Sequence, residues 1–416
     1  MLITSILLLS AQQATVAETT TASDIRAADL RSHIGFLASD ELEGRESGLD
    51  GGHKAANYVE SNFRRVGLKP LANQKGAYQI SFELRRQGLT CNNVVGVLPG
   101  TNPDFADKYI AIGGHHDHAG IGGPGAMGFP GEIHNGADDN ASGTSGVLEL
   151  AEYYAANPLQ HPIIFMTFSA EERGLLGSKA LVDSNVLEND KILFMINLDM
   201  IGRMQDDNLF VGGLGTAQEL HPLLDPVFAK SELKLELDDR GEAPSDNTSF
   251  FHAGIPALFF FTNIHEDYHM PGDDADKINY DGEVQVLNLV DQVVRKLDTV
   301  NSLEFVDYGG MGMPADFEER MTKHYRTIMQ RSSMKGKLGI RANVEGSILT
   351  INSVSESSAA AEAGLKIGDE LLEVNGKTIT SMKDLRIALG GGLRGDEIKL
   401  VVMRAGSKQT LSATLK

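Results

Sequence analysis

The fold is constrained most strongly by five short, nearly continuous apolar segments that recur along the chain. They are NNVVGVL (92–98), YIAIGG (109–114), PIIFMTF (162–168), ILFMINLDM (192–200) and PALFFFT (256–262). Segments with apolar residues at three- and four-residue spacing, such as 142–156 and 284–300, predict helices between and after them. Strands this apolar are buried on both faces. The sequence therefore predicts an α/β fold with a mostly parallel sheet covered by helices.

The texture of the sequence changes twice along the chain. Residues 23–68 have helical periodicity and precede the apolar segments, so residues 18–308 are predicted to form one domain. The Gly- and Met-rich stretch that follows, with a helix after it, reads as a linker and helix over residues 309–334. From 335 to 416, short alternating strands and Gly-rich turns predict a second, small, strand-rich domain.

Composition excludes several classes of protein. Of the 416 residues, 41% are hydrophobic and 23% are charged, which is the composition of a globular protein rather than a disordered one. The net charge of -20 repels phosphate groups, so nucleic acid and anionic membrane surfaces are not expected partners. The single cysteine, Cys91, cannot form an intramolecular disulfide.

The amino terminus resembles a secretory leader. An apolar run from Leu2 to Leu9 is followed by small residues up to Ala17, which predicts a signal peptide over residues 1–17 and a periplasmic or extracellular protein. No Lys or Arg precedes Arg26, so the basic start of such a leader is reduced to the amino group. The alternative is an intact N-terminal helix of a cytosolic protein. No other stretch is long and apolar enough to be a transmembrane helix.

Metal-capable side chains follow the predicted strands. Parallel strands bring their carboxyl ends to one edge of a sheet, where such folds bind their ligands, so these side chains are expected to converge. They are His115 to His118 after the second strand, Asp138 and Asp139 before a helix, Glu171 and Glu172 after the third strand, Asp199 in the fourth, and His265 and His269 after the fifth.

Imidazole and carboxylate ligands together suit Zn²⁺. Two zinc ions roughly 3.5 to 4 Å apart would share one carboxylate and still need an open position for water. The adjacent pair Glu171 and Glu172 can supply one ligand and one proton acceptor that point in different directions.

The stretch from His265 to His269 also fits the H-E-x-x-H pattern of single-zinc metalloproteases. That pattern requires a helix, because two histidines four residues apart share a metal only when both project from one helical face. Pro271 and Gly272 follow closely, and an apolar strand precedes the stretch. A strand ending in a loop is the preferred interpretation.

Taken together, the ordered motifs resemble those of co-catalytic di-zinc aminopeptidases of metallopeptidase family twenty-eight, a group that also contains glutamate carboxypeptidases and glutaminyl cyclases. The resemblance covers about residues 23–300 and rests on IAIGGHHDH, HNGADDNASG, SAEERGLLGS, NLDMIGR and HEDYHMPGDDADKIN. It implies two Zn²⁺ per chain, with Asp139 as the bridging ligand. One ion would also be bound by Glu172 and His269, and the other by His115 and Asp199.

The resemblance further implies that Glu171 is the general base and that Asp117 orients a zinc-binding histidine. Arg203 and His265 are candidate substrate contacts, with a salt bridge and a structural role as their respective alternatives. Asp138 is expected to support the ligands rather than bind metal. Three other histidines near the motifs, His116, His118 and His134, are interpreted as hydrogen-bonded loop residues rather than ligands.

Residues 335–416 resemble a PDZ domain of the bacterial-protease type. The match rests on GKLGI, AAAEAGLKIGDELLEVNGKTI and SMKDLRIALG. The resemblance implies a carboxylate-binding loop at Lys337, Leu338, Gly339 and Ile340, which would receive the C-terminus of a peptide or protein by strand addition. The alternative is a packing or dimerisation module without a ligand.

These features predict a secreted zinc exopeptidase that removes N-terminal residues from peptides. A carboxypeptidase would need a cationic pocket for the substrate carboxylate, and only Arg173 and Arg203 lie near the motifs. A glutaminyl cyclase is a further alternative among enzymes. Outside enzymes, the alternative is a PDZ-based binding protein with an inactive peptidase domain.

Overall fold

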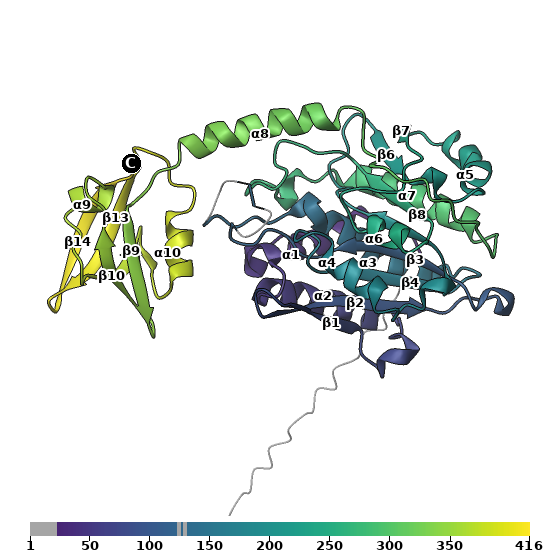
Figure 1. Cartoon of the computed structure of the whole chain (residues 1–416), viewed down its shortest axis with the longest axis horizontal. Coiled ribbons are helices and arrows are strands. Elements are labelled where there is room, and N and C mark those ends of the chain that lie inside the picture. Colours follow the sequence, from purple (N-terminus) through teal and green to yellow (C-terminus); the bar gives the residue numbers. More distant parts are fainter. Residues whose placement is uncertain (1–22, 123–125, 128–130) are drawn as a thin grey trace, which may run out of the picture.

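The computed structural model describes residues 23–122, 126–127 and 131–416. A large α/β domain and a small strand-rich domain are joined by the long helix α8 (Phe317–Ser333), which lies between them in Figure 1. The predicted signal peptide lies outside the described residues. Among the described residues, no helix combines the length and the apolar character that crossing a membrane would take.

The large domain is built on one eight-stranded sheet. Its spatial order is β1-β2-β4-β3-β5-β8-β6-β7. The four central strands, β4, β3, β5 and β8, are parallel to one another, whereas β2 and β6 run antiparallel to their central neighbours. The strands are β1 (Gln79–Leu84), β2 (Leu89–Leu98), β3 (Tyr109–His115), β4 (Ile163–Phe168), β5 (Ile192–Leu198), β6 (Asn208–Gly212), β7 (Lys234–Leu237) and β8 (Ala257–Phe261).

Helices cover both faces of this sheet. One face packs against α1, α2, α3, α5 and α7, and the other packs against α4 and α6. Side chains alternate between the two cores along β3, where Ile110 and Ile112 face one core and Ala111 faces the other. The helices are α1 (Ala27–Leu37), α2 (Asp50–Arg65), α3 (Gly143–Ala156), α4 (Leu176–Asp183), α5 (Leu220–Phe228), α6 (Asn247–His252) and α7 (Tyr280–Leu297).

The small domain has a second sheet in the order β14-β13-β11-β10-β9, with β12 paired to β11. The strand β9 follows the predicted carboxylate loop directly and lies at the edge of this sheet. Its elements are β9 (Ile340–Glu345), β10 (Ile348–Val354), α9 (Ala359–Glu362), β11 (Glu370–Val374), β12 (Lys377–Thr378), α10 (Met382–Leu389), β13 (Glu397–Arg404) and β14 (Ser407–Thr414). Its apolar core is separate from that of the large domain.

The predicted fold class is confirmed, with two refinements. The central strands are buried along almost their whole length, as their apolar sequences predicted. The sheet is extended by β1, β6 and β7, whose sequences mix polar and apolar residues and gave no clear strand signal. The helical stretch predicted over 23–68 is two helices separated by a 3-10 segment (Asp40–Arg45), in which Gly44 has a φ of 70°. Residues 265–272 form no helix, in agreement with the preferred interpretation.

Candidate metal centre

The predicted metal ligands meet at the carboxyl ends of the parallel strands. His115 is the last residue of β3, Glu171 and Glu172 follow β4, and Asp199 follows β5. Asp139 comes from a short segment just before α3, and His269 from the loop after β8. The topology of the sheet therefore gathers residues that are more than 150 positions apart, because the four central parallel strands end at the same edge.

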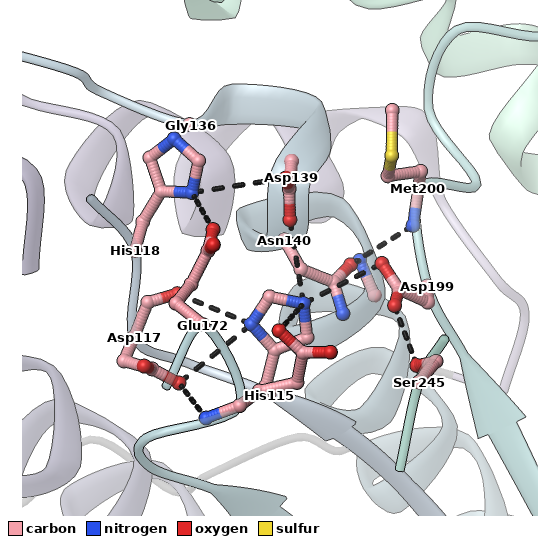
Figure 2. Close-up of polar contacts among 12 residues, drawn as sticks. His115, Asp117, His118, Gly136, Asp139, Asn140, Glu172, Asp199, Met200 and Ser245 are labelled. Carbon is pink, nitrogen blue, oxygen red and sulfur yellow. Dashed lines mark hydrogen bonds and ion pairs between the residues drawn. The ribbon is translucent and has the colours of Figure 1, made fainter. Parts of the chain in front are cut away.

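His115 lies between two carboxylates. Its Nε2 atom is 3.3 Å from Asp139 Oδ1 and 3.5 Å from Asp199 Oδ1 (Figure 2). Among the described residues these three form one of the groups whose ligand atoms all lie close enough together to hold a metal ion. His115 and Asp139 are almost fully buried, and Asp199 is 7% exposed.

Asp139 presents its two oxygens to different imidazoles. While Oδ1 faces His115, Oδ2 is 2.8 Å from Nε2 of His269, and that same nitrogen is 3.4 Å from Glu172 Oε2. A carboxylate that faces one ligand set with each oxygen has the placement that a ligand bridging two metal ions requires.

The donor set fits zinc on geometric and chemical grounds. Zinc bonds of about 2.0–2.2 Å place the ligand atoms of a tetrahedral site about 3.3–3.6 Å apart. The spacings around His115 and between His269 and Glu172 are of that size. Several acidic side chains are buried together here, which is costly unless a cation or hydrogen bonds compensate their charge.

The electrostatics of the cluster suit a cation at this place. Burial alone would lower the pKa of His115, but the surrounding carboxylates, Glu171 and Asp199 first among them, together hold that pKa well above its usual value. Burial, assisted by the charges of Glu172, Asp246 and Asp199, raises the pKa of Glu171 well above that of an ordinary glutamate. A bound cation would oppose both shifts.

Glu171 lies beside the cluster rather than inside either ligand group. Its Oε2 atom is 3.9 Å from Nε2 of His115. The carboxylate of Asp117 holds the segment in place, because Oδ1 accepts a hydrogen bond of 3.1 Å from the backbone N–H of Glu171 and Oδ2 accepts one of 2.5 Å from the Ser47 hydroxyl. Asp117 also lies next to His115. The Nδ1 atom of His115 is 3.7 Å from the carboxylate of Asp117 and 3.2 Å from the backbone carbonyl of Asp117.

Three further side chains fix the ligands, and sequence reasoning did not single them out. Ser245 donates a hydrogen bond of 2.5 Å to Asp199. Asp273 accepts hydrogen bonds from the backbone N–H groups of Asp138 and Asp139. Such contacts hold ligands in one orientation before a metal arrives. The third side chain is Arg45.

Arg45 is completely buried beneath the cluster. Its guanidinium donates hydrogen bonds to four backbone carbonyls, those of Leu37 at 2.7 Å, His116 at 2.9 Å, Asn135 at 2.5 Å and Gly136 at 2.9 Å. Two of these carbonyls belong to the segment that leads into Asp139, and one lies beside His115. A single arginine in a Gly-containing stretch gives no sequence signal for this role.

A pocket with an apolar wall opens above the candidate metal ligands. Beside the metal-capable residues it is lined by Met200, Phe261, Tyr268, Met313 and Phe317. Met313 and Phe317 belong to the segment that the sequence predicted as linker and helix, so this segment forms part of the pocket wall as well as joining the domains.

Arg203 and His265 are engaged by carboxylates. Arg203 forms hydrogen bonds of 3.3 Å with Asp267, which is the salt-bridge alternative of the sequence analysis. Nε2 of His265 lies 3.2 Å from Asp138 Oδ2, and both side chains are buried. Neither is among the described residues that line the apolar pocket.

In the small domain, the predicted loop from Lys337 to Ile340 leads into the edge strand β9. Gly339 has a φ of 81°, which favours glycine. The carbonyls of Leu338 and Gly339 accept hydrogen bonds from the backbone N–H groups of Ala360 in α9 and Ser355 just after β10, which anchor the loop to both elements.

Buried imidazoles and carboxylates at the carboxyl edge of the parallel strands form a candidate metal centre on an α/β scaffold. Comparison with known proteins places this scaffold in a family. Residues 93–294 match the profile of Peptidase family M28, and residues 336–415 match that of the PDZ domain. The chain therefore carries a domain of peptidase family M28 followed by a PDZ domain.

Relatives and solved structures agree with this assignment. The chain is 29% identical over 224 residues to leucine aminopeptidase 1 of Leptosphaeria maculans, a match that covers 49% of this chain and 55% of that protein. The chain thus spans about half the length of the curated relatives it matches. The fold is similar to a zinc aminopeptidase from Bacillus subtilis (TM-score 0.52, 19% identity, 68% and 97% covered) and to a glutaminyl cyclase from Fimbriiglobus ruber (TM-score 0.51, 18% identity, 65% and 95% covered).

Proposed function

We propose that the protein is a zinc-dependent aminopeptidase that holds two Zn²⁺ per chain. The observation that carries this proposal is the placement of Asp139, whose two oxygens face separate imidazoles while Glu171 lies next to one of them. The match to Peptidase family M28 and the similarity to leucine aminopeptidases support the peptidase assignment. His115, Asp139 and Asp199 would hold one ion, and Asp139, Glu172 and His269 the other.

Bound zinc would supply polarisation of the scissile carbonyl and a more acidic water molecule. The side chains of the protein would transfer the proton, position the base and bind the substrate. Glu171 would accept the proton of the attacking water at its carboxylate and pass it to the leaving amine. Asp117 would keep that carboxylate in position through the backbone of Glu171. The apolar pocket that contains Phe317 would bind the N-terminal side chain of the substrate.

The substitution Glu171→Gln tests this assignment. The amide keeps the shape of the side chain and cannot accept the proton, so we expect unchanged zinc content and a fall in kcat by a factor of at least about 100. The assay compares aminoacyl chromogenic amides with their N-acetylated forms. Cleavage of the free-amine substrates only, lost in the variant, is the expected result. A variant with full activity would remove Glu171 from the mechanism.

The same assay separates the alternatives. A carboxypeptidase would cleave peptides that have a free C-terminus and a blocked N-terminus. A glutaminyl cyclase would convert peptides with N-terminal glutamine and leave the amides intact. The nearby arginines favour neither alternative, since Arg203 is paired with Asp267 and Arg173 lies 2.8 Å from Glu46. A purified chain that contains no zinc and cleaves none of these substrates would indicate a binding protein.

For the small domain, we propose that β9 and the loop from Lys337 to Ile340 receive the C-terminus of a peptide or protein. The open edge of β9 supports strand addition, and Gly339 shapes the loop at its start. The apolar run from Leu2 to Leu9 supports the further proposal that the protein works in the periplasm or outside the cell.

A further inference from the structure

His118 lies inside the metal cluster, although the five predicted ligands do not include it. The residue is 1% exposed. Its Nδ1 atom is 2.7 Å from Glu172 Oε1 and 3.8 Å from Asp139 Oδ2, and Figure 2 shows this nitrogen turned toward both carboxylates. Among the described residues, His118, Asp139 and Glu172 form the second group whose ligand atoms are close enough to hold a metal ion.

The contacts of His118 do not satisfy it as a hydrogen-bonded residue. Both of its ring nitrogens, and the Oε1 atom of Glu172 that it faces, lack a hydrogen-bond partner of acceptable geometry among the described residues. Its neighbour His116 is different, because Nδ1 of His116 is 2.9 Å from the Thr167 hydroxyl. Buried polar atoms without a partner cost free energy. A metal ion bound by both Nδ1 of His118 and Oε1 of Glu172 would give each of these atoms a partner.

Glu172 lies between two imidazoles. Its Oε1 atom faces His118, while Oε2 faces His269, whose ring centre is 5.6 Å from that of His118. Both imidazoles also face the same oxygen of Asp139, at 3.8 Å and 2.8 Å. The two histidines therefore surround one and the same pair of carboxylates.

We propose that His118 binds zinc through Nδ1, as a fourth protein ligand of the site formed by Asp139, Glu172 and His269. This inference rests on the proposed two-zinc function. The other site keeps three protein ligands, His115, Asp139 and Asp199.

This difference in ligand number makes the two sites unequal. Zinc sites with four protein ligands are closed and hold their metal firmly, whereas sites with three keep a position open for solvent or substrate. Glu171 lies 3.9 Å from His115, on the side of the three-ligand site. The His118 site thus fills first and serves mainly as an anchor, and the open position lies next to the base.

The experiment counts the imidazoles around the first zinc ion. The metal-free full-length protein is loaded with one equivalent of Zn²⁺ and examined by X-ray absorption at the zinc edge, which reports the number of imidazole ligands. In parallel, zinc release from the fully loaded protein is followed against a graded series of chelator concentrations. Neither readout depends on enzymatic activity.

Three variants are compared with the parent protein for the number of imidazole ligands and for zinc release. His118→Ala removes the ligand, and His118→Asp places a carboxylate oxygen near the position of Nδ1, where it can still bind zinc. His116→Ala is the matched control, because His116 is equally buried in the same loop but belongs to neither ligand group. Thermal unfolding of each variant shows that it is folded.

We expect two imidazoles around the first zinc ion in the parent protein and in His116→Ala, and one in His118→Asp. His118→Ala should release one of its two zinc ions at a 10- to 100-fold lower chelator concentration, and His118→Asp should recover most of that loss. A single imidazole in the parent protein, or an imidazole count that does not change in His118→Ala, would overturn the inference. Either result is compatible with an active aminopeptidase. A parent protein that binds zinc without cleaving any substrate would instead contradict the proposed function.

Discussion

At the residue scale, the buried guanidinium of Arg45 holds the predicted ligands in position. Among the described residues, Arg45 has the largest side chain that is fully buried, and its desolvation lowers its pKa to about 10, so it remains charged at neutral pH. It binds four carbonyls from three separate parts of the chain. The segments that carry His115 and Asp139 are thereby tied to the 3-10 segment that contains Arg45.

The substitution Arg45→Met tests this role. Methionine fills similar space and leaves the four carbonyls without a partner, so we expect a loss of about 3–5 kcal/mol in the free energy of unfolding and a lower zinc content. Denaturant titration and elemental analysis measure these quantities. Arg64→Ala is the control, since its exposed ion pair with Glu60 contributes at most about 1 kcal/mol. Equal effects in both variants would contradict the role of Arg45.

The buried carboxyl of Glu149, which lies outside the candidate metal site, should make the stability of the protein depend on pH. Burial raises the pKa of this carboxyl to about 7, from an ordinary value of 4.5. Between these two pH values the folded chain keeps a proton that the unfolded chain has lost, so stability falls as the pH rises from about 4.5 to about 7 and stays low above it. One carboxylate oxygen accepts a hydrogen bond of 2.6 Å from the Arg26 backbone, and the other has no partner among the described residues.

Glu149→Gln keeps an acceptor for Arg26 and cannot ionise. At pH 8 the variant should therefore be more stable than the parent protein by on the order of 1–3 kcal/mol, and near pH 4.5 the two should be similar. Denaturant titrations at both pH values give the comparison. If the two proteins differ by the same amount at pH 4.5 and pH 8, the ionisation of Glu149 does not contribute.

Single residues also show how far the sequence could be read. His115, Glu172 and Asp199 could be predicted to converge, because each follows an apolar strand and parallel strands end at one edge. Arg45 gives no such signal, and His118, which follows the same strand as His115, is interpreted from the sequence as a hydrogen-bonded loop residue rather than a ligand. The position of His118 depends on a backbone bridge to Glu46, more than 70 residues away, and no local pattern reports such a pairing.

At the element scale, α8 packs against the large domain at its first residue and is exposed further along. Its first residue, Phe317, packs edge-on against Phe261 of β8 with ring centres 6.4 Å apart and lines the pocket above the metal cluster. Further along, Met329 is 72% exposed, and the helix continues toward the small domain (Figure 1). The sequence predicted this helix from its periodicity but not its packing, because the Gly- and Met-rich stretch before it resembles a flexible connection.

Phe317→Ala should therefore change substrate preference. Removing the ring widens the apolar pocket, so kcat/KM for a leucyl substrate should fall roughly 10-fold while a bulkier aromatic N-terminal residue is affected less. Met329→Ala, on the exposed part of the same helix, should leave the preference unchanged. The ratio of kcat/KM values for leucyl and phenylalanyl amides measures the effect. An unchanged ratio in Phe317→Ala would exclude α8 from the substrate pocket.

At the scale of the whole molecule, the domain of peptidase family M28 and the PDZ domain are joined by α8, whose first residue lines the pocket of the large domain. The contact between the domains includes an ion pair of Lys383 in α10 with Glu43, which lies in the same 3-10 segment as Arg45. The predicted domain boundaries at residues 308 and 335 remain predictions. The structure adds that residues 313–317 contribute to the large domain's pocket.

The proposed ligand of the small domain gives the last prediction. A peptide that adds to the edge of β9 would place its terminal carboxylate at the loop from Lys337 to Ile340, so a free C-terminus should bind and an amidated one should bind at least about 10-fold more weakly. Gly339→Ala should abolish binding, because φ at this position is 81° and the new Cβ would collide with Ser358.

The control variant is Gly346→Ala, since its φ of 61° is also positive but a Cβ there would meet open space. Fluorescence anisotropy with labelled peptides on the full-length protein measures all four cases, and equal binding of free and amidated peptides would indicate that the small domain is a packing module.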